Sequence, residues 1–300
     1  MNPLETKLLD FTLKNPLIMA SGTYGFGREL EMYYSPNILG GISSKGLTRY
    51  PKPGNSGIRI WETPSGMLNS IGLENPGVEH FCEYEVEDMR KIDTLLMVNL
   101  GGNTLDEYIE GVEFLNEVDI DILELNISCP NVKEGGMAFG LTCDSAAKVT
   151  SEVVKRSKHP VIVKLSPNGE DVSSLAKSVE DVGACGVSLI NTLQGMAVDV
   201  KNKRIVFDNI YAGLSGPAVK PIALRMVHQV AKAVSIPVIG LGGISNARDV
   251  LEFLMVGATC VQIGTANLFD PRAVPKIIED LEIYCIEEGI KNLSEICGIL

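Results

Sequence analysis

The chain has 300 residues, of which 45% are hydrophobic and 21% charged, a balance typical of a globular protein with a sizeable core. Its 38 acidic residues outnumber 26 basic ones, and the formal net charge of −12 argues against a surface for nucleic acid or anionic membranes. Seven cysteines are scattered without any Cys-x-x-Cys pair, so no zinc site or iron–sulfur cluster is predicted and a reducing compartment is indicated.

The N-terminal fifteen residues hold no continuous apolar segment of the kind found in secretory signals, and no later run approaches the length of a membrane span. We therefore expect a cytoplasmic protein. Three hundred residues lie within the normal span of one (β/α)8 barrel, and no linker or repeat divides the chain. We expect a single domain over residues 1–300.

Short apolar segments recur at fairly even intervals, and each is too short for a helix. They are residues 16–20, 41–44, 95–99, 122–126, 161–165, 187–191, 237–240 and 259–263. Segments with turn-spaced apolar residues separate them, for example 172–182 and 222–234, and these predict helices. Parallel strands covered by helices are apolar on both faces, so the alternation predicts an α/β fold, a (β/α)8 TIM barrel. A doubly wound open sheet is the competing architecture, but eight consecutive units favour closure.

Two segments are too long for ordinary loops of such a barrel. Residues 47–77 are rich in Pro, Gly, Asn and Ser, and they contain a predicted hairpin around Ile58–Trp61. Residues 196–214 alternate in character on either side of a turn at residues 201–203, which predicts a second hairpin. Barrels of this class do their chemistry at the C-terminal face, so we expect both inserted hairpins to roof the active site there.

The segment Asn126-Ile127-Ser128-Cys129-Pro130-Asn131 directly follows the buried-strand pattern of residues 121–125. A free cysteine is commonly a small core residue, but the neighbours of Cys129 are loop formers. A cysteine just past the end of a strand, fixed by proline and flanked by amides, indicates chemistry on a small polar ligand.

Polar residues or glycines lie at the C-terminal end of every predicted strand, and these ends meet at one mouth of a barrel. They are Ser21, Gly22, Lys45, Gly46, Asn99, Asn126, Lys164, Asn191, Thr192, Gly242, Gly243, Gly264 and Thr265. Each alone is explained by a turn, but their gathering at one mouth predicts a ligand site. The glycines after the seventh and eighth strands leave backbone N–H groups free to bind an anion, so we expect a phosphate group there. Plain tight turns are the alternative at these two places.

Lys164 interrupts the apolar strand at residues 161–165. Burying an unpaired ammonium is costly, so an anionic or electron-rich group should face it. It could be a Schiff-base lysine of an aldolase or a cation beside a reduced cofactor, and a solvated lysine at the strand end is the third alternative. We expect Lys45 to be a second cation at the mouth.

Taken in this order, these residues resemble the dihydroorotate dehydrogenase family, the flavin enzymes of pyrimidine biosynthesis. The resemblance runs from about residue 15 to residue 266. It is carried by Ala20-Ser21-Gly22, Ser44-Lys45-Gly46, Asn69 to Gly77, Asn126 to Asn131, Lys164, Asn191-Thr192, Gly213 to Gly216 and the two glycine turns.

The resemblance implies FMN in the barrel mouth. The implied cofactor residues are Ser21, Lys45, Gly46, Asn99, Asn126, Lys164, Ser215, Gly216, Gly242, Gly243, Gly264 and Thr265. The phosphate would sit on the glycine turns, and Lys164 would stabilise the negative charge that develops on the flavin ring. The implied substrate residues are Lys45, Asn69, Ile71, Gly72, Leu73, Asn126, Asn131, Asn191 and Thr192. Lys45 and the backbone of residues 71–73 would receive the carboxylate of dihydroorotate.

The same resemblance implies that Cys129 is the general base. It would take a proton from C5 of (S)-dihydroorotate while hydride leaves C6 for N5 of FMN, and the product would be orotate. A thiol near its usual pKa of about 8.5 is mostly protonated at neutral pH, so activity should rise with pH. Residues 132–140 would then form a lid that keeps water away.

The motifs at residues 69–77 and 129–136 most resemble the NAD-linked type of the family. That resemblance implies a homodimer joined to a second subunit in a heterotetramer, in which FAD and a [2Fe–2S] cluster on the second subunit pass electrons to NAD. The chain itself has no cluster motif and no Gly-x-Gly-x-x-Gly turn. The alternatives are the fumarate-using type, a dihydropyrimidine dehydrogenase-like flavoprotein, a lyase or isomerase of phosphorylated sugars, and a flavin-binding subunit without chemistry of its own.

Overall fold

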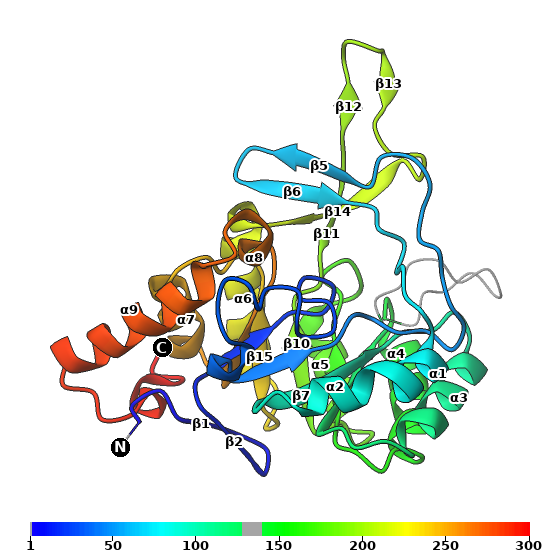
Figure 1. The fold of residues 1–300 in the computed structure, drawn as a ribbon. Helices are drawn as coiled ribbons and strands as arrows, with labels where there is room; N and C mark the ends of the chain where they lie inside the picture. Colours follow the sequence, from blue (N-terminus) through cyan, green and yellow to red (C-terminus); the bar gives the residue numbers. More distant parts are fainter. Residues whose placement is uncertain (1, 128–139) are drawn as a thin grey trace.

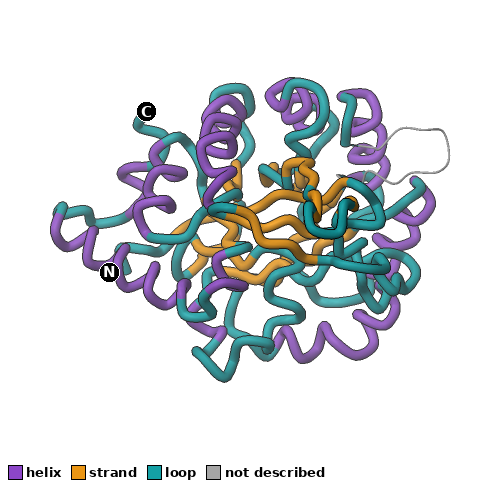
Figure 2. Tube along the Cα trace, turned by 90° about the horizontal axis from the view of Figure 1, so that it is seen from above, coloured by secondary structure: helices purple, strands orange, loops and turns teal. Residues whose placement is uncertain are grey.

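The computed structural model describes residues 2–127 and 140–300. Eight strands, each parallel to its neighbours, close into a barrel in the order β10-β15-β16-β3-β4-β7-β8-β9. They are β3 (Leu17–Met19), β4 (Gly41–Ser43), β7 (Leu95–Leu100), β8 (Ile122–Asn126), β9 (Val161–Lys164), β10 (Gly186–Leu189), β15 (Val238–Leu241) and β16 (Cys260–Ile263). Each overlaps one of the eight predicted segments, and the predicted TIM barrel is confirmed. Figure 2 shows the strands at the centre with helices around them.

Four of the described helices begin where a polar side chain satisfies one of their first backbone N–H groups. Thr104 caps the helix at 105–115 in this way, and Asn246 caps the helix at 247–255. The helices are α1 (Val78–His80), α2 (Val86–Arg90), α3 (Leu105–Leu115), α4 (Cys143–Val154), α5 (Val172–Glu180), α6 (Lys220–Ala231), α7 (Ala247–Met255), α8 (Ala266–Phe269) and α9 (Ala273–Glu287), with short turns η1 (Pro36–Ile38), η2 (Phe81–Glu85), η3 (Pro217–Val219) and η4 (Leu293–Ile296). The predicted helices at 172–182 and 222–234 correspond to α5 and α6. Within residues 2–127 and 140–300, no helix has the length and apolar character needed to cross a membrane.

An N-terminal hairpin, β1 (Thr6–Leu8) and β2 (Phe11–Leu13), covers one end of the barrel. Leu8 and Leu13 are buried there against the inward residues at the starts of the barrel strands. The sequence analysis did not predict this hairpin, because two strands of three residues give too short an alternation to recognise. With this end closed by apolar side chains, a ligand can enter only from the opposite mouth.

The two inserted segments combine into one sheet above that mouth (Figure 1). Its strands are β5 (Ile60–Thr63), β6 (Gly66–Asn69), β11 (Leu193–Met196) and β14 (Tyr211–Ser215), in the antiparallel order β11-β14-β6-β5. The second predicted hairpin, β12 (Val198–Asp199) and β13 (Arg204–Ile205), extends from it. The expectation that both insertions roof the barrel is confirmed, and the first hairpin begins two residues later than predicted. We call the four-stranded sheet the roof sheet.

Candidate active site

Buried polar side chains fill the C-terminal half of the barrel interior. They are Ser43, Asn99, Glu124, Lys164, Ser188 and Gln262, and none is more than 4% exposed. Inward positions alternate along a strand, so Ile122, Glu124 and Asn126 of β8 occupy three successive levels. Ile122 belongs to the apolar cluster over the N-terminal hairpin, and the polar level begins at Glu124.

Glu124 lies at the centre of this polar cluster. Its Oε2 accepts hydrogen bonds from Oγ of Ser43 at 2.9 Å and Nδ2 of Asn99 at 2.6 Å. Its Oε1 accepts from Oγ of Ser188 at 2.8 Å and Nε2 of Gln262 at 2.6 Å. These four donors come from β4, β7, β10 and β16, so one carboxylate connects four other strands of the barrel.

Lys164 meets the same carboxylate. Its Nζ lies 3.7 Å from Oε2 of Glu124 and donates to Oε1 of Gln262 at 3.2 Å. Burial raises the pKa of Glu124, but the charge of Lys164 and the hydrogen bonds from Asn99, Gln262 and Ser188 outweigh it and hold that pKa below its ordinary value. The prediction that an anionic group faces Lys164 is confirmed, and that group is Glu124. Gln262 supplies the one hydrogen-bond acceptor that the described residues offer to Nζ, which leaves donor capacity for a ligand.

Above the ion pair, several predicted site residues come together at the mouth. Asn126 donates from Nδ2 to Oδ1 of Asn99 at 3.2 Å. A Cβ added at Gly46 would lie 3.0 Å from Oδ1 of Asn99, 2.8 Å from Cδ1 of Leu73 and 3.6 Å from Oγ of Ser21. Glycine at position 46 therefore lets the chain after β4 pack closely against Leu73 and Asn99, near the residues that the sequence predicts for the cofactor.

The roof sheet brings Asn69 and Thr192 to one place. Asn69 donates from Nδ2 to the carbonyl oxygen of Gly213 at 3.3 Å, and a Cβ at Gly213 would collide with Oγ1 of Thr192. The backbone N–H of Thr192 donates to Oδ1 of Asn191 at 2.7 Å. Three predicted substrate residues, from two segments far apart in the chain, therefore lie around one strand of the roof sheet.

The loop at residues 71–73 is held by Asn75, whose side chain is 5% exposed. Oδ1 of Asn75 accepts from the backbone N–H of Thr48 at 3.1 Å and of Gly77 at 2.9 Å, and its Nδ2 donates to the carbonyl oxygen of Leu73 at 2.7 Å. Gly72 and Leu73 both have positive φ angles, 77° and 54°, so this part of the loop has a conformation that side chains disfavour. A fixed loop of this shape exposes backbone groups, as the predicted carboxylate site requires.

Lys45 precedes Gly46 on the opposite side of that loop. The Arg59 guanidinium, bonded to Glu74 at 2.6 Å, holds the pKa of that carboxyl below its usual range, and the charge of Lys45 adds to the effect. No carboxylate within the described part of the chain forms an ion pair with the Lys45 ammonium. This cation is therefore available to an anionic ligand at the mouth.

Three loops converge on a cradle that lacks side chains. Gly216 has a φ of 99°, and Gly242–Gly243 have φ angles of 127° and 78°. A Cβ at Gly243 would lie 2.8 Å from the carbonyl oxygen of Gly216, and one at Gly216 would lie 3.5 Å from Cγ2 of Thr265. At Gly264, by contrast, the nearest atom is Cβ of Ala20 at 3.6 Å, so a Cβ would make only ordinary van der Waals contacts. Such a cradle of backbone groups, followed by α6, suits a phosphate.

Two predicted residues lie outside the described part of the chain. They are Cys129, the predicted base, and Asn131, one of the predicted substrate amides. The predicted lid at 132–140 lies outside it as well, apart from Gly140. These assignments stay predictions.

The sequence analysis assigned no role to Ser43, Glu124, Ser188 or Gln262. A usable signal was present, because Glu124 and Lys164 are opposite charges at inward positions of consecutive apolar strands. The hydroxyls and the amide carry no such signal, since they are common in strands and only the closed barrel brings them to Glu124.

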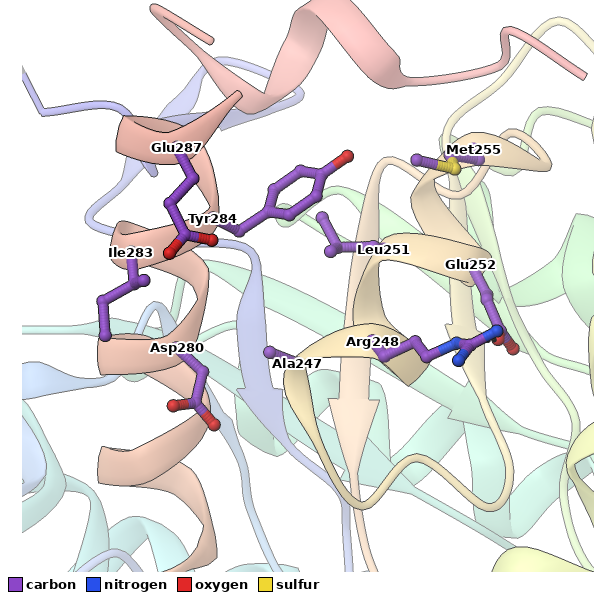
Figure 3. A pocket seen from close by; sticks show the side chains of 9 residues that line it. All are labelled: Ala247, Arg248, Leu251, Glu252, Met255, Asp280, Ile283, Tyr284 and Glu287. Carbon is purple, nitrogen blue, oxygen red and sulfur yellow. Dashed lines mark hydrogen bonds and ion pairs between the residues drawn. The ribbon is translucent and has the colours of Figure 1, made fainter. Parts of the chain in front are cut away.

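A groove on the outer surface between α7 and α9 contains none of the predicted site residues (Figure 3). Its floor is apolar, with Leu251 and Tyr284, and its Arg248 is paired with Glu252 at 3.3 Å. Among residues 2–127 and 140–300, no group of three or more His, Cys, Asp or Glu side chains is arranged to hold a metal ion. The barrel mouth is therefore the place where chemically active groups gather.

The fold and this mouth define a TIM-barrel protein with a glycine cradle and a buried lysine–glutamate pair, an arrangement suited to a phosphate-bearing cofactor. The model of the dihydroorotate dehydrogenase family matches residues 3–284. The chain belongs to this family.

Named relatives cover almost the whole chain. It is 52% identical over 287 residues to the dihydroorotate dehydrogenase B (NAD(+)), catalytic subunit, of Petrotoga mobilis, covering 96% of each chain. It is 49% identical over 299 residues to the protein of that name from Geobacillus kaustophilus, covering 99% of this chain and 96% of the other. For the Bacteroides fragilis protein, identity is 48% over 301 residues, covering 100% and 99%. Membership implies that the chain binds a flavin, and the word subunit implies that these relatives work with a partner.

Proposed function

We propose that this chain oxidises (S)-dihydroorotate to orotate in pyrimidine biosynthesis, with FMN bound in the barrel mouth. The observation that carries the proposal is that one mouth of the barrel has both a glycine cradle, around Gly216, Gly243 and Gly264, and the buried ammonium of Lys164. A flavin mononucleotide needs both features, one for its phosphate and one for its ring. Family membership and the names of the relatives support the reaction.

The residues at the mouth fit FMN on three counts. At the glycine cradle, Gly216 and Gly243 approach each other closely without intervening side chains, and backbone N–H groups of such a turn would bind the phosphate. The Lys164 ammonium has donor capacity left after its bond to Gln262. A Cβ at Gly46 would press on Leu73 and Asn99, so glycine there lets the loops that would line the ring approach one another closely. When bound, FMN supplies a hydride acceptor at N5.

Lys164 contributes a fixed positive charge beside the ring. Its side chain is 5% exposed, so its charge acts with little screening by water and stabilises negative charge as hydride is transferred. A Schiff-base role, the alternative for this lysine, requires a neutral amine, and an ionised Glu124 at 3.7 Å disfavours that state.

The substrate would lie between the flavin and the roof sheet. We assign its amide groups to Asn69, Asn126, Asn131, Asn191 and Thr192. We assign its carboxylate to Lys45 and the backbone of residues 71–73, because Lys45 has no ion-pair partner among the described residues and Asn75 holds that loop open. A pyrimidine without a carboxylate would make no ion pair with Lys45, which favours dihydroorotate over the dihydropyrimidine alternative.

Cys129 is the proposed base, and the argument for it rests on the sequence and the family. It takes the C5 proton of dihydroorotate on Sγ, while the C6 hydride leaves for N5 of FMN and the C5–C6 double bond of orotate forms. In the sequence it comes three residues after Asn126, where β8 ends, and barrel enzymes have their catalytic residues after the C-terminal ends of strands.

Electrons would leave through a second subunit. We propose that a partner with FAD and a [2Fe–2S] cluster passes them to NAD, and that two copies of this chain form the centre of a heterotetramer. The names of the relatives, which specify NAD(+) and a catalytic subunit, support this type over the fumarate-using one. The chain's lack of a dinucleotide-binding turn is in accord with NAD binding elsewhere.

The decisive experiment adds dihydroorotate to the purified yellow protein without oxygen and follows the flavin absorbance. Bleaching with stoichiometric formation of orotate is expected. A colourless protein that does not take up FMN, or a bound flavin that stays oxidised with dihydroorotate, would refute the proposal. Repeating the assay with NAD or fumarate, with and without a co-purified partner, assigns the acceptor: reduction of NAD only with the partner is expected, and turnover with fumarate alone would assign the other type.

A further inference from the structure

Glu124 has no part in the reaction as described so far, yet it is the most constrained ionisable group of the described chain. It is fully buried, and its two carboxylate oxygens accept four hydrogen bonds of 2.9 Å or less. Hydrogen bonds from four different strands fix a carboxylate far more firmly than packing does. A group held this way can fix the position of another group that touches it.

Lys164 is the group that it touches. The two residues are on neighbouring strands, β8 and β9, and their charged atoms are 3.7 Å apart. Gln262 bridges them, since its Nε2 donates to Glu124 and its Oε1 accepts from Lys164 at 3.2 Å. The other side chains that face the pair, from β4, β7 and β10, are the neutral Ser43, Asn99 and Ser188. Glu124 is therefore the single counter-charge for Lys164 among the described residues.

An ammonium without this counter-charge would be unstable in the barrel. Desolvation disfavours the charged form of a buried lysine, and a long flexible side chain has many positions open to it. An ionised Glu124 stabilises the positive charge of Lys164 and also orients its side chain. Nζ then has the fixed carboxylate of Glu124 on one side and the fixed amide oxygen of Gln262 on another. The remaining hydrogens of Nζ are then available on the side of the mouth.

We propose that Glu124 is a positioning residue, whose carboxylate, tied to the barrel wall, holds the Lys164 ammonium charged and in place beneath the flavin. This inference rests on the proposed function for the identity of the flavin, but the ion pair itself does not. Glu124 thus controls how strongly the protein favours reduced over oxidised FMN without touching the cofactor.

The first test uses the protein without flavin. Glu124→Gln leaves a buried ammonium without its counter-charge, Lys164→Met leaves a buried carboxylate, and the double variant removes both charges. Thermal unfolding of all four proteins gives the coupling between the two residues. We expect each single variant to melt below wild type and the double variant to melt above Glu124→Gln. A double variant no more stable than Glu124→Gln would overturn the pairing, and the cycle remains informative if Glu124→Gln folds poorly.

The second test measures the midpoint potential of bound FMN against pH. In Glu124→Gln we expect the midpoint potential at pH 8.5 to fall toward that of Lys164→Met. The expected fall is at least a tenfold change in the ratio of the affinities for reduced and oxidised FMN, which is about 30 mV for a two-electron couple. At pH 6 the Lys164 amine of this variant should take up a proton again, and the potential should return toward wild type. Ser188→Ala, which removes one hydrogen bond to the same carboxylate and leaves both charges, is the matched control and should keep the wild-type potential.

Two outcomes of the second test would overturn the positioning role. One is a Glu124→Gln potential equal to wild type at every pH. The other is a Glu124→Gln potential more positive than that of wild type at both pH values. That result would mean that Glu124 acts on the flavin only as a negative charge and does not position Lys164. Failure of the proposed function is distinguishable from both, because a wild-type protein that binds no FMN would refute that proposal while the unfolding cycle would still report on the pair.

Discussion

Asn99 donates from Nδ2 to Oε2 of Glu124 at 2.6 Å, and this bond determines which way the Asn99 amide faces. An ionised carboxylate only accepts hydrogen bonds, so the NH2 group of Asn99 must point toward it. The Oδ1 atom then points to the other side, where it accepts from Nδ2 of Asn126 at 3.2 Å. The charge of Glu124 thereby determines which atom of the Asn99 side chain donates a hydrogen bond and which accepts one. Asn99 is one of the residues that the sequence predicts to bind the cofactor.

Asn99→Asp is predicted to be destabilising because it places two carboxylates at hydrogen-bond distance in a buried site. We expect a loss of about 3 kcal/mol in the free energy of unfolding near pH 7. Repulsion by Glu124 would raise the pKa of the new carboxyl in the folded protein, so the loss should grow as pH rises above about 4 through that raised value. Denaturant unfolding from pH 4 to 8 measures it.

The exchange variant, Asn99→Asp with Glu124→Gln, is the control for this prediction. It keeps one acid and one amide at the two positions, and it should recover part of the lost stability. An Asn99→Asp protein as stable as wild type at pH 8 would show that the bond between these residues does not orient the amide.

Gly264→Ala separates the fold from the phosphate site. A Cβ at this position has its nearest neighbour at 3.6 Å, an ordinary contact, so the flavin-free protein should unfold within about 0.5 kcal/mol of wild type. If the phosphate lies against the backbone of Gly264, the added methyl group should weaken FMN binding at least tenfold. Fluorescence titration with FMN measures the affinity, and unchanged binding would place the phosphate elsewhere.

Gly243→Ala gives the contrasting result. The residue has a φ of 78°, and a Cβ would lie 2.8 Å from the carbonyl oxygen of Gly216. We expect this variant to lose about 1–3 kcal/mol of stability through backbone strain as well as FMN affinity. A loss of FMN affinity without a loss of stability, as expected for Gly264→Ala, indicates that the phosphate lies in the cradle. A loss of both, as expected for Gly243→Ala, indicates that the cradle itself is disturbed.

The barrel could be predicted from the sequence because its signal is local. Each strand is a short apolar segment followed by a polar residue or glycine, and Val161–Lys164 is recognisable without knowledge of its neighbours. Residues at the strand ends, such as Asn126 and Gly243, could be predicted as site residues for the same reason, since the fold alone carries them to one mouth.

The pairing of the two insertions into one roof sheet, and the hydrogen bonds of the polar interior, could not be predicted because they join distant segments. Asn69 and Gly213 are 144 residues apart, and nothing near either one indicates that β6 pairs with β14. Gln262 reaches Glu124 across 138 residues of chain. The role of Asn75 could not be predicted either, because it depends on the folded loop at 71–73 that Asn75 holds. The segment 69–77 nevertheless contributed to the family resemblance.

Glu180 makes a pH-dependent contribution to the stability of the fold, at a position away from the candidate active site. Its carboxylate accepts from Oγ of Ser235 at 2.5 Å, from Lys177 at 2.9 Å and from the backbone N–H of Ser235, and these bonds lower its pKa from 4.5 to about 2. A lowered pKa means that the ionised form stabilises the fold above pH 4.5 and that this contribution is lost as pH falls toward 2.

For Glu180→Gln we expect a loss of about 1 kcal/mol at pH 7, a reduced figure because water screens this partly exposed group. The difference from wild type should shrink as pH is lowered from 4.5 to 3, which denaturant unfolding at several pH values detects. Glu287→Gln, a surface exchange without an ion pair among the described residues, should match wild type throughout. A Glu180→Gln deficit that stays constant down to pH 3 would contradict the assigned cause.

Asn75→Ala tests whether the loop at 71–73 is a preformed carboxylate site. The variant leaves the backbone N–H groups of Thr48 and Gly77 and the carbonyl oxygen of Leu73 without their partner, at a cost of about 1–3 kcal/mol in stability. Loosening of the loop should raise KM for dihydroorotate more than it lowers kcat, because the lost interaction is a binding one. Asn55→Ala removes a side chain from the same region that bonds to Ser70, and it serves as the comparison. Equal effects of both on KM would argue against a specific role for Asn75.

Cys129→Ser tests the proposed base directly. A serine hydroxyl is a much weaker acid than a thiol, so far less of it is ionised at neutral pH, and turnover should fall by about 10²–10⁴-fold. Because the side chains are nearly the same size, binding of FMN and orotate should stay close to wild type. The wild-type rate of flavin reduction should rise with pH toward the thiol pKa of about 8.5, and the variant should lack that rise below pH 9. Stopped-flow reduction without oxygen measures both, and a fully active Cys129→Ala would exclude the thiol as base, since alanine has no group that can accept the C5 proton.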